Sequence, residues 1–343
     1  MTSYKVNVLT AEKTIEVSEL ELKHPKDSQV LLKIDACAIC TLEQRLFQGV
    51  IKNYPFAGGH EIAGTVVEIG DKVKYLKPGD RAAVRLLTNC GECFYCRTGR
   101  ENLCVHSFNA RVHEGIPGPG GFAEYMLVDS QAAFKVAGNL NPLYAALAEP
   151  LACCVHSVRN GGIELGDDVV VIGAGVMGAF HIKLAKMRGS RVIACEVDPA
   201  RLEIARSMGA DVLINSKERN AVEAVKELTE GRGADAVFCA VAIPSLAEEA
   251  IKMAGKFGRV VMYSSFHPKD PIPLDVNSVH YSEIIITGSV NPGIRDFYTA
   301  VRLLSLGLVD PSGLVSGSYP LENIREAFQH AVTPGTYRVI VTC

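Results

Sequence analysis

The sequence has no excess of positive charge and no long apolar run. It carries 35 Lys and Arg against 38 Asp and Glu, a formal net charge of -3. No Lys/Arg cluster stands out, which argues against nucleic acid as a partner. Apolar stretches such as 169–172 and 284–286 are too short to span a bilayer, and the first residues lack the apolar run of a secretory signal. We therefore expect no membrane partner and a cytoplasmic location.

The length and the hydrophobic pattern predict two domains of the α/β class. At 343 residues, 48% of them hydrophobic, the chain is too long for one ordinary core. Before residue 150, short apolar runs separated by turn residues predict a β-rich domain. After residue 150, strands alternate with helices, a pattern typical of a parallel sheet covered on both faces. The strands of that second part are predicted at 169–172, 191–196, 212–214, 236–239, 259–263 and 283–289, and its helices at 145–161, 176–188, 199–208, 218–229 and 244–254.

Four of the eleven cysteines form a cluster with metal-ligand spacing. Cys90, Cys93, Cys96 and Cys104 follow the pattern C-x2-C-x2-C-x7-C. Two-residue gaps let neighbouring thiolates converge on one ion, and four sulfurs complete a tetrahedral shell, so the cluster predicts structural zinc. A redox or disulfide use is the alternative, but the odd count and the absence of an export signal favour metal. The scattered cysteines are expected mostly as small buried residues.

A glycine-rich motif predicts a dinucleotide site. Gly173-x-Gly175-x-x-Gly178 follows four β-formers and opens a predicted helix. Glycine permits a tight turn and lets backbone N–H groups approach a pyrophosphate at a helix N-terminus. The alternative is a glycine turn in an α/β fold without cofactor. The predicted contacts also include Val176, Met177 and, in the next predicted helix, Arg201.

An acidic residue at the end of the second strand predicts the cofactor. Glu196 ends the predicted strand 191–196, at the distance expected for a carboxylate that binds the adenosine ribose. That charge would repel the 2′-phosphate of NADP, so we expect NAD. Asp198 competes for this role, but we interpret it as a turn residue before Pro199.

A second, mixed constellation is less specific by itself. Cys40 follows a predicted strand, and His60 and Glu61 precede another. One thiolate, one imidazole and one carboxylate would leave a fourth position open, as catalytic zinc requires. Spacing alone does not establish this site, because a lone histidine is more often a core or surface residue.

Together these motifs resemble the zinc-containing medium-chain dehydrogenase/reductase family, in its sorbitol (polyol) and threonine dehydrogenase branches, along essentially the whole chain. The matching residues are Cys40, Gly59-His60-Glu61 with Gly64, the four-cysteine cluster, Glu149-Pro150-Leu151-Ala152 and the Gly173 motif.

The resemblance implies a GroES-like catalytic domain from residues 1–150 and 290–343, with a zinc lobe at about 89–105. It also implies a Rossmann domain over 151–289. Two zinc ions per chain are expected, the catalytic one held by Cys40, His60 and either Glu61 or Glu149. A homo-oligomer, dimer or tetramer, is expected as well.

Two departures from the family concern the proton relay and the substrate. Leu42 stands where relatives carry a hydroxyl residue, so we hypothesise that Glu149 or Glu61 takes over the relay through zinc-bound water. Glu43 replaces the usual Asp, and either a hydrogen bond to a ligand or an ordinary salt bridge would explain it. Asn291-Pro292 stands where polyol dehydrogenases carry an Arg-Tyr pair. Further pocket candidates, each weighed against plain packing or surface roles, are Arg45, Phe47, Phe56, Phe108 and His113.

The resulting functional hypothesis is a zinc- and NAD-dependent dehydrogenase of a secondary alcohol, in particular a polyol, sugar alcohol or sugar derivative. In the mechanism that the resemblance implies, zinc favours deprotonation of the hydroxyl and hydride passes to the nicotinamide. An L-threonine 3-dehydrogenase-like activity is the alternative, and a simple-alcohol dehydrogenase comes third. A regulatory protein on the same fold would be expected to have a broken metal shell, whereas here every ligand position is filled.

Overall fold

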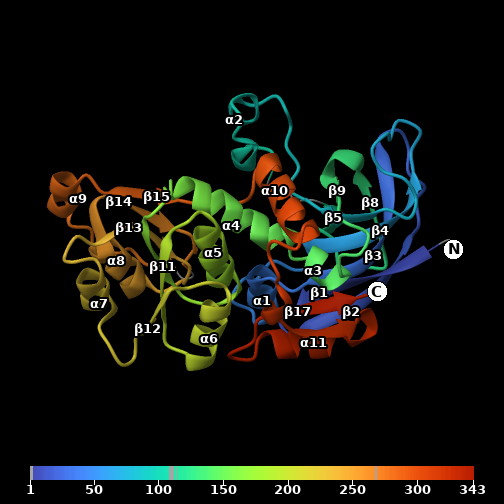
Figure 1. Ribbon diagram of the computed structural model, residues 1–343. Helices are drawn as coiled ribbons and strands as arrows, with labels where there is room; N and C mark the ends of the chain where they lie inside the picture. The colour runs from blue at the N-terminus through green and yellow to red at the C-terminus, as the bar shows by residue number, and fades with distance from the viewer. Residues whose placement is uncertain (1–2, 108–111, 114, 267–268) are drawn as a thin grey trace. The chain divides into compact units, whose positions relative to one another are not determined.

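The computed structural model describes residues 3–107, 112–113, 115–266 and 269–343, with the backbone alone described for 112–113 (Figure 1). The chain divides into two compact units. Unit 1 comprises residues 1–152 and 293–343, and unit 2 comprises residues 153–292. Within the described residues, no helix is both long and apolar enough to cross a membrane.

Unit 1 is built on a seven-stranded sheet with the order β16-β17-β3-β4-β5-β9, in which β8 also pairs with β3. Both ends of the chain contribute to it, because C-terminal β17 pairs antiparallel with β3. Two further pairs of strands, β1 with β2 and β6 with β7, form separate two-stranded sheets. The strands of unit 1 are β1 (Ser3–Ala11), β2 (Thr14–Glu21), β3 (Gln29–Ala38), β4 (Glu61–Ile69), β5 (Arg81–Val84), β6 (Val112–His113), β7 (Ile116–Pro117), β8 (Tyr125–Asp129), β9 (Ala133–Lys135), β16 (Val315–Pro320) and β17 (Arg338–Thr342). Its helices are α1 (Thr41–Phe47), α2 (Phe94–Arg97), α3 (Pro142–Ala145), α10 (Ile294–Ser305), α11 (Ile324–Ala331) and α4 (Ala148–Asn160), which continues into unit 2.

The core of unit 1 joins residues from both chain segments. Alternate residues of β1 and β3 pack with the buried face of α11, where Phe328 contacts Phe47 and Phe122 with ring centroids 5.1 and 5.5 Å apart. This packing anchors the short α1, which begins directly after Cys40. The sheet therefore fixes the backbone from which the predicted ligands project.

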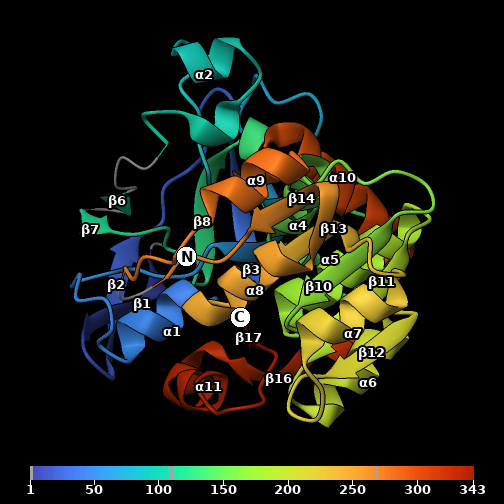
Figure 2. The ribbon, with the colours of Figure 1, turned by 90° about the vertical axis from the view of Figure 1, so that its left-hand side faces the viewer.

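Unit 2 contains a six-stranded, fully parallel sheet with the order β12-β11-β10-β13-β14-β15 (Figure 2). Strands β11 and β12 are added on one side of β10, and strands β13, β14 and β15 on the other. The order of strands therefore switches between β10 and β13, the position where doubly wound folds bind dinucleotides. Its strands are β10 (Asp168–Ile172), β11 (Arg191–Glu196), β12 (Val212–Asn215), β13 (Ala234–Cys239), β14 (Ala254–Met262) and β15 (Ile285–Gly288). Its helices are α5 (Val176–Met187), α6 (Pro199–Ser207), α7 (Ala221–Leu228), α8 (Pro244–Met253) and α9 (Val276–Ser282).

Most predicted elements of unit 2 are present, with two corrections at their ends. The helix predicted at 145–161 begins at Ala148, because Asn141 caps a separate short helix, α3, that ends at Ala145. The strand predicted at 259–263 begins at Ala254, directly after α8. In the chain as a whole, helices α1, α2, α3, α9 and α10 and strands β6, β7, β9 and β16 were not predicted.

Candidate active site

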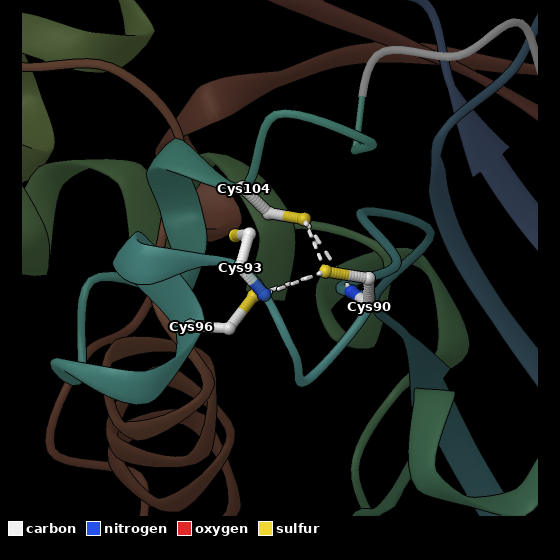
Figure 3. A group of neighbouring side chains, drawn as sticks. All are labelled: Cys90, Cys93, Cys96 and Cys104. Atoms are coloured by element: carbon white, nitrogen blue, oxygen red, sulfur yellow. Dashed lines mark hydrogen bonds between the residues drawn. The ribbon is translucent and has the colours of Figure 1, made fainter.

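The four-cysteine cluster lies in a lobe formed by α2 and the short 3-10 helix Glu101–Leu103 (Figure 3). All four sulfur atoms lie within 4.8 Å of one another. The Sγ of Cys90 lies 3.9 Å from that of Cys96 and 3.7 Å from that of Cys104. A tetrahedral ion with Zn–S bonds of about 2.3 Å places its sulfurs about 3.8 Å apart. The cluster therefore has the dimensions that zinc requires.

Backbone N–H groups around the lobe favour thiolates. The N–H of Cys93 donates to Cys90 Sγ at 3.3 Å, and the N–H of Cys90 donates to Cys104 Sγ at 3.4 Å. The backbone N–H of Cys96, followed by that of Val105, lowers the pKa of Cys93 to about 6. Deprotonated sulfur is the form that binds metal, so these hydrogen bonds favour metal binding at Cys93 and at Cys104, whose pKa is also lowered. Burial has the opposite effect on Cys96 and raises its pKa to about 12.

Cys40 and His60 are brought together from two strand ends. Cys40 follows β3 and is the N-cap of α1, and His60 precedes β4. Gly59 before it has a φ of +93°, and a Cβ there would lie 2.8 Å from both Cys37 Sγ and the N of Phe122. Only glycine fits this turn, which delivers His60 beside Cys40. One ligand atom from each of Cys40, Glu43 and His60 lies within 4.8 Å of the other two.

Glu43 orients the imidazole. Its side chain is fully buried, and Oε1 accepts from the Gly59 N–H at 3.0 Å and lies 2.8 Å from His60 Nδ1. Burial would raise the pKa of Glu43, but the His60 ring outweighs it and lowers the pKa. For His60, burial opposes the charged form, yet Glu43 and Cys40 raise its pKa well above the ordinary value. Of the two roles weighed for Glu43, the structure has the hydrogen bond to His60.

Glu61 is held by a buried arginine that the sequence motifs did not identify. Glu61 Oε1 lies 2.6 Å from Arg338 Nη2, and its Oε2 accepts from Arg338 Nε at 2.9 Å. The Glu61 side chain is 0% exposed and that of Arg338 is 7% exposed. Burial lowers the pKa of Arg338, but Glu61 and Cys40 outweigh it and raise the pKa, so the guanidinium stays charged. Arg338 Nη2 also lies 3.8 Å from Cys40 Sγ. The sequence offered one sign of this pair, because Arg338 is a single charged residue at the start of an otherwise apolar stretch.

Glu149 is the third member of a group of possible metal ligands with His60 and Glu61. It lies in the first turn of α4, and its carboxylate is within 4.8 Å of ligand atoms of His60 and Glu61. Leu42, at the relay position, is 39% exposed and has no group that could carry a proton. Besides Glu43, the structure therefore brings two carboxylates close to His60, Glu61 and Glu149, and Arg338 binds the first of these.

The substrate-pocket candidates have different outcomes. Phe47 is buried in the core of unit 1 against Phe328, which agrees with the packing role weighed for it. Phe56 also packs against that core. Arg45 is partly buried in α1, and Asn291 has a φ of +55° and a buried Nδ2. Phe108 and the side chain of His113 lie outside the described residues.

The glycine-rich loop has the backbone that the motif predicted. Gly173 has a φ of +91°, and a Cβ on Gly178 would lie 1.8 Å from the Gly173 carbonyl oxygen. Gly175 is different, because its Cβ would meet only Arg201 Nη1 at 3.9 Å. It is the N-cap of α5 and makes no side-chain cap, so N–H groups at this helix end remain available to an anion. Val176 is buried, and the Met177 carbonyl oxygen lies 2.7 Å from His181 Nδ1.

Glu196 closes the same loop. It is 8% exposed, and its Oε2 accepts from the Ala174 N–H at 2.8 Å, while Oε1 accepts from the N–H groups of Val197 and Asp198. Asp198 Oδ1 accepts from the Ala200 N–H and caps α6, which agrees with a turn role for Asp198. Glu196 thus fixes the loop and leaves a carboxylate where an adenosine ribose would lie in a dinucleotide fold.

Two family models match the chain. The alcohol dehydrogenase GroES-like domain matches residues 26–138, and the zinc-binding dehydrogenase domain matches residues 176–305. D-arabitol-phosphate dehydrogenase of Enterococcus avium is 31% identical over 329 residues, which cover 94% of this chain and 92% of the relative. L-threonine 3-dehydrogenase of Pyrococcus horikoshii is 32% identical over 323 residues, covering 92% and 91%. Sorbitol dehydrogenase of Bacillus subtilis is 29% identical over 334 residues, covering 96% and 93%.

Solved structures agree with these matches. A zinc-binding dehydrogenase of Sinorhizobium meliloti, bound to NADP, has a TM-score of 0.91 and 28% identity, with all of both chains covered. The expected combination of a GroES-like domain and a parallel-sheet Rossmann domain is confirmed. The chain belongs to the zinc-containing medium-chain alcohol dehydrogenase family, in the branch that holds sorbitol and threonine dehydrogenases.

Proposed function

We propose that the protein oxidises a secondary alcohol group of a polyol or a polyol derivative, with NAD as the hydride acceptor. The observation that carries this proposal is that His60 belongs to two groups of close ligand atoms, one with Cys40 and Glu43 and one with Glu61 and Glu149. The relatives of the chain include enzymes named for arabitol phosphate and sorbitol. When bound there, zinc supplies a Lewis acid for the substrate oxygen, and the nicotinamide supplies the redox chemistry.

Within this proposal, Cys40, His60 and Glu149 hold the catalytic zinc. Glu61 acts as a positioning residue, since Arg338 binds both of its oxygens. Glu43 keeps the proton of His60 on Nδ1 and so leaves Nε2 as the free ligand atom. The Glu149 carboxylate also serves as the proton acceptor that Leu42 cannot provide. The second zinc of the chain is held by the four-cysteine cluster.

The preference for NAD rests on Glu196. A buried carboxylate at the end of β11 accepts hydrogen bonds from ribose hydroxyls and repels a 2′-phosphate. The predicted cofactor contacts are otherwise Gly173, Gly175, Val176, Met177, Gly178 and Arg201.

The assignment of domains, oligomer and compartment is part of the same proposal. The catalytic domain spans residues 1–150 and 290–343, and the Rossmann domain spans 151–289. The division of the chain into compact units of residues 1–152 with 293–343 and of residues 153–292 supports these bounds. Strand β15 forms one edge of its sheet, so a second copy could extend the sheet in a homodimer or tetramer. None of the eleven cysteines forms a disulfide, as is typical of the reducing cytoplasm.

A threonine-like substrate is the second candidate. It is supported by the relatives named L-threonine 3-dehydrogenase and by Asn291, which stands where polyol dehydrogenases are expected to carry an Arg-Tyr pair. An amino alcohol needs an acceptor for its ammonium group rather than hydroxyl partners along a sugar chain.

A substrate panel tests the proposal. Purified protein is assayed by NADH fluorescence with sorbitol, xylitol, arabitol, arabitol phosphate, threonine and ethanol, each with NAD and with NADP. We expect a polyol or its phosphate with NAD to give the highest kcat/KM, and chelation to abolish turnover. Threonine as the best substrate would favour the second candidate, and turnover that survives complete loss of zinc would end the proposal.

An isosteric variant and a matched control test the two roles proposed for Glu149. E149Q should lower both kcat and catalytic zinc content, whereas E164Q, an exposed control, should change neither. An E149Q variant with full zinc and an unchanged pH profile would exclude Glu149 from both of its proposed roles.

A further inference from the structure

Unit 2 contains a cavity that the dinucleotide loop does not account for. It has a volume of about 540 Å³ and is lined by residues from the ends of α7 and α8, the start of β14 and helix α9. Strands β13 and β14 begin at this edge of the sheet, whereas the glycine-rich loop follows the end of β10. None of the lining residues lies between 173 and 201. Its volume is in the range of small-molecule pockets, about 300–1,000 Å³.

Cations outnumber anions around the cavity. Four basic side chains line it against two acidic ones: Lys226, Arg232, Lys252 and Lys256 against Glu248 and Asp275.

Two of these cations are already paired. Lys252 Nζ lies 2.5 Å from Glu248 Oε1, and Arg232 Nη2 lies 3.1 Å from Asp168 Oδ2. Among the described residues, Lys226 and Lys256 make no ion pair. Among the described residues, the lining therefore holds two cations without an ion pair, Lys226 and Lys256, against one acidic side chain, Asp275, which accepts from the Asn277 N–H as the cap of α9.

Lys256 owes its position to a strained bulge in β14. Ala234 pairs with Ala254 and Ala236 pairs with Arg259, so the intervening segment of β14 leaves the ladder. Phe257 within it has a φ of +62° and is 66% exposed, a conformation that costs free energy for a bulky residue. A bulge of this kind redirects side chains and persists only where the surrounding structure maintains it.

The C-terminal ends of helices explain the presence of some, but not all, of the lysines around the cavity. Lys226 and Lys252 lie in the last turns of α7 and α8, where a cation also stabilises the free carbonyl groups. Lys256 belongs to a strand, so this explanation does not extend to it.

The rest of the lining suits an organic group. Ile251, Leu274 and Ile284 give apolar surface, and the hydroxyl residues Ser278 and Ser282 of α9 offer hydrogen bonds.

We propose that this cavity binds a small phosphorylated organic molecule. Its phosphate lies between Lys226 and Lys256, and its organic part lies against Ile251, Leu274 and Ile284. Lysines bind phosphate as point charges, and a phosphate that carries an organic group also removes apolar surface from water. The site is separate from catalysis and does not depend on the proposed substrate.

Calorimetric titration tests the proposal with phenyl phosphate as the probe. The zinc-loaded protein is held in saturating NAD, so that the dinucleotide loop is occupied. The double variant K226Q/K256Q is compared with K217Q, which removes an exposed lysine elsewhere in unit 2. All three substituted lysines are exposed, and thermal unfolding checks that each variant is folded.

We expect one phenyl phosphate per chain, bound more tightly than inorganic phosphate, with no binding of phenol. Affinity should fall about tenfold or more in K226Q/K256Q and should weaken with added salt, while K217Q should stay within about twofold of the unsubstituted protein. Absence of saturable binding, equal affinity in K226Q/K256Q, or phosphate bound as tightly as phenyl phosphate would each overturn the proposal.

Discussion

Removal of the Arg338 guanidinium tests whether the buried pair with Glu61 stabilises unit 1. In R338M, a methionine fills much of the same volume, but Glu61 loses partners at 2.6 and 2.9 Å. The side chains of Glu61 and Arg338 are both buried, so water cannot replace the lost hydrogen bonds. Breaking such a pair on one side costs about 3–5 kcal/mol in the free energy of unfolding. For a unit of this size, that loss corresponds to a fall in Tm of roughly 6–20 °C.

Urea unfolding and calorimetry measure this change directly. R295M removes an exposed arginine of α10 and should stay within about 0.5 kcal/mol of the unsubstituted protein. The double variant E61L/R338M replaces both charges by apolar groups and should recover most of the loss. A cost for R338M below about 1 kcal/mol, or no recovery in the double variant, would show that the pair is not buried as described.

Three further predictions concern other parts of the chain. C104S should remove one zinc per chain by mass spectrometry of the metal content and lower the Tm, because three sulfurs cannot close the tetrahedral shell. G175A should fold normally, because its Cβ would meet only Arg201 Nη1 at 3.9 Å. It should bind NAD about tenfold or more weakly by fluorescence titration, because a side chain there hinders the approach of a pyrophosphate to the backbone N–H groups. G178A should unfold at lower temperature, since its Cβ would collide with the Gly173 carbonyl oxygen. Burial lowers the pKa of His181 to about 4, so its ring stays neutral in the folded protein. In the unfolded chain the same ring gains a proton as the pH falls through about 6.5, and the free energy of unfolding therefore decreases on acidification. Between about pH 7.5 and 5 this costs about 2 kcal/mol, and H181Q should show a shallower fall in urea midpoint over that range.

The parallel strands of unit 2 could be predicted because their burial appears directly in the sequence. All five residues of β10 are buried, and the sequence there is an unbroken run of apolar residues after Asp168. Strand β16 was missed because its side chains alternate between partly buried and exposed, with no buried residue at all. Helix α1 was missed for a related reason, since its seven residues bury a glutamate beside two apolar side chains.

The metal ligands could be predicted, but the residues that support them could not. Cys90 and its three partners lie within fifteen positions of one another, so spacing alone reveals the cluster. Arg338 and Glu61 are 277 positions apart, and the pairings of β17 with β3 and of β3 with β4 bring them together. Local pattern carries no information about such a contact.

The arrangement of charge around Cys40 gives a physical reason for a cation in this part of unit 1. Two carboxylates, Glu43 and Glu61, are completely buried, and a buried carboxylate is costly unless it is neutralised. Arg338 neutralises Glu61 with two hydrogen bonds, whereas Glu43 has only neutral donors and the His60 ring, and its Oε2 has no hydrogen-bond partner among the described residues. The raised pKa of His60 reflects this unbalanced charge, because a proton on the ring is attracted by both Glu43 and Cys40. A dication bound to Cys40 and His60 satisfies the same field without that proton, so the buried Glu43 favours metal binding through the imidazole that it orients.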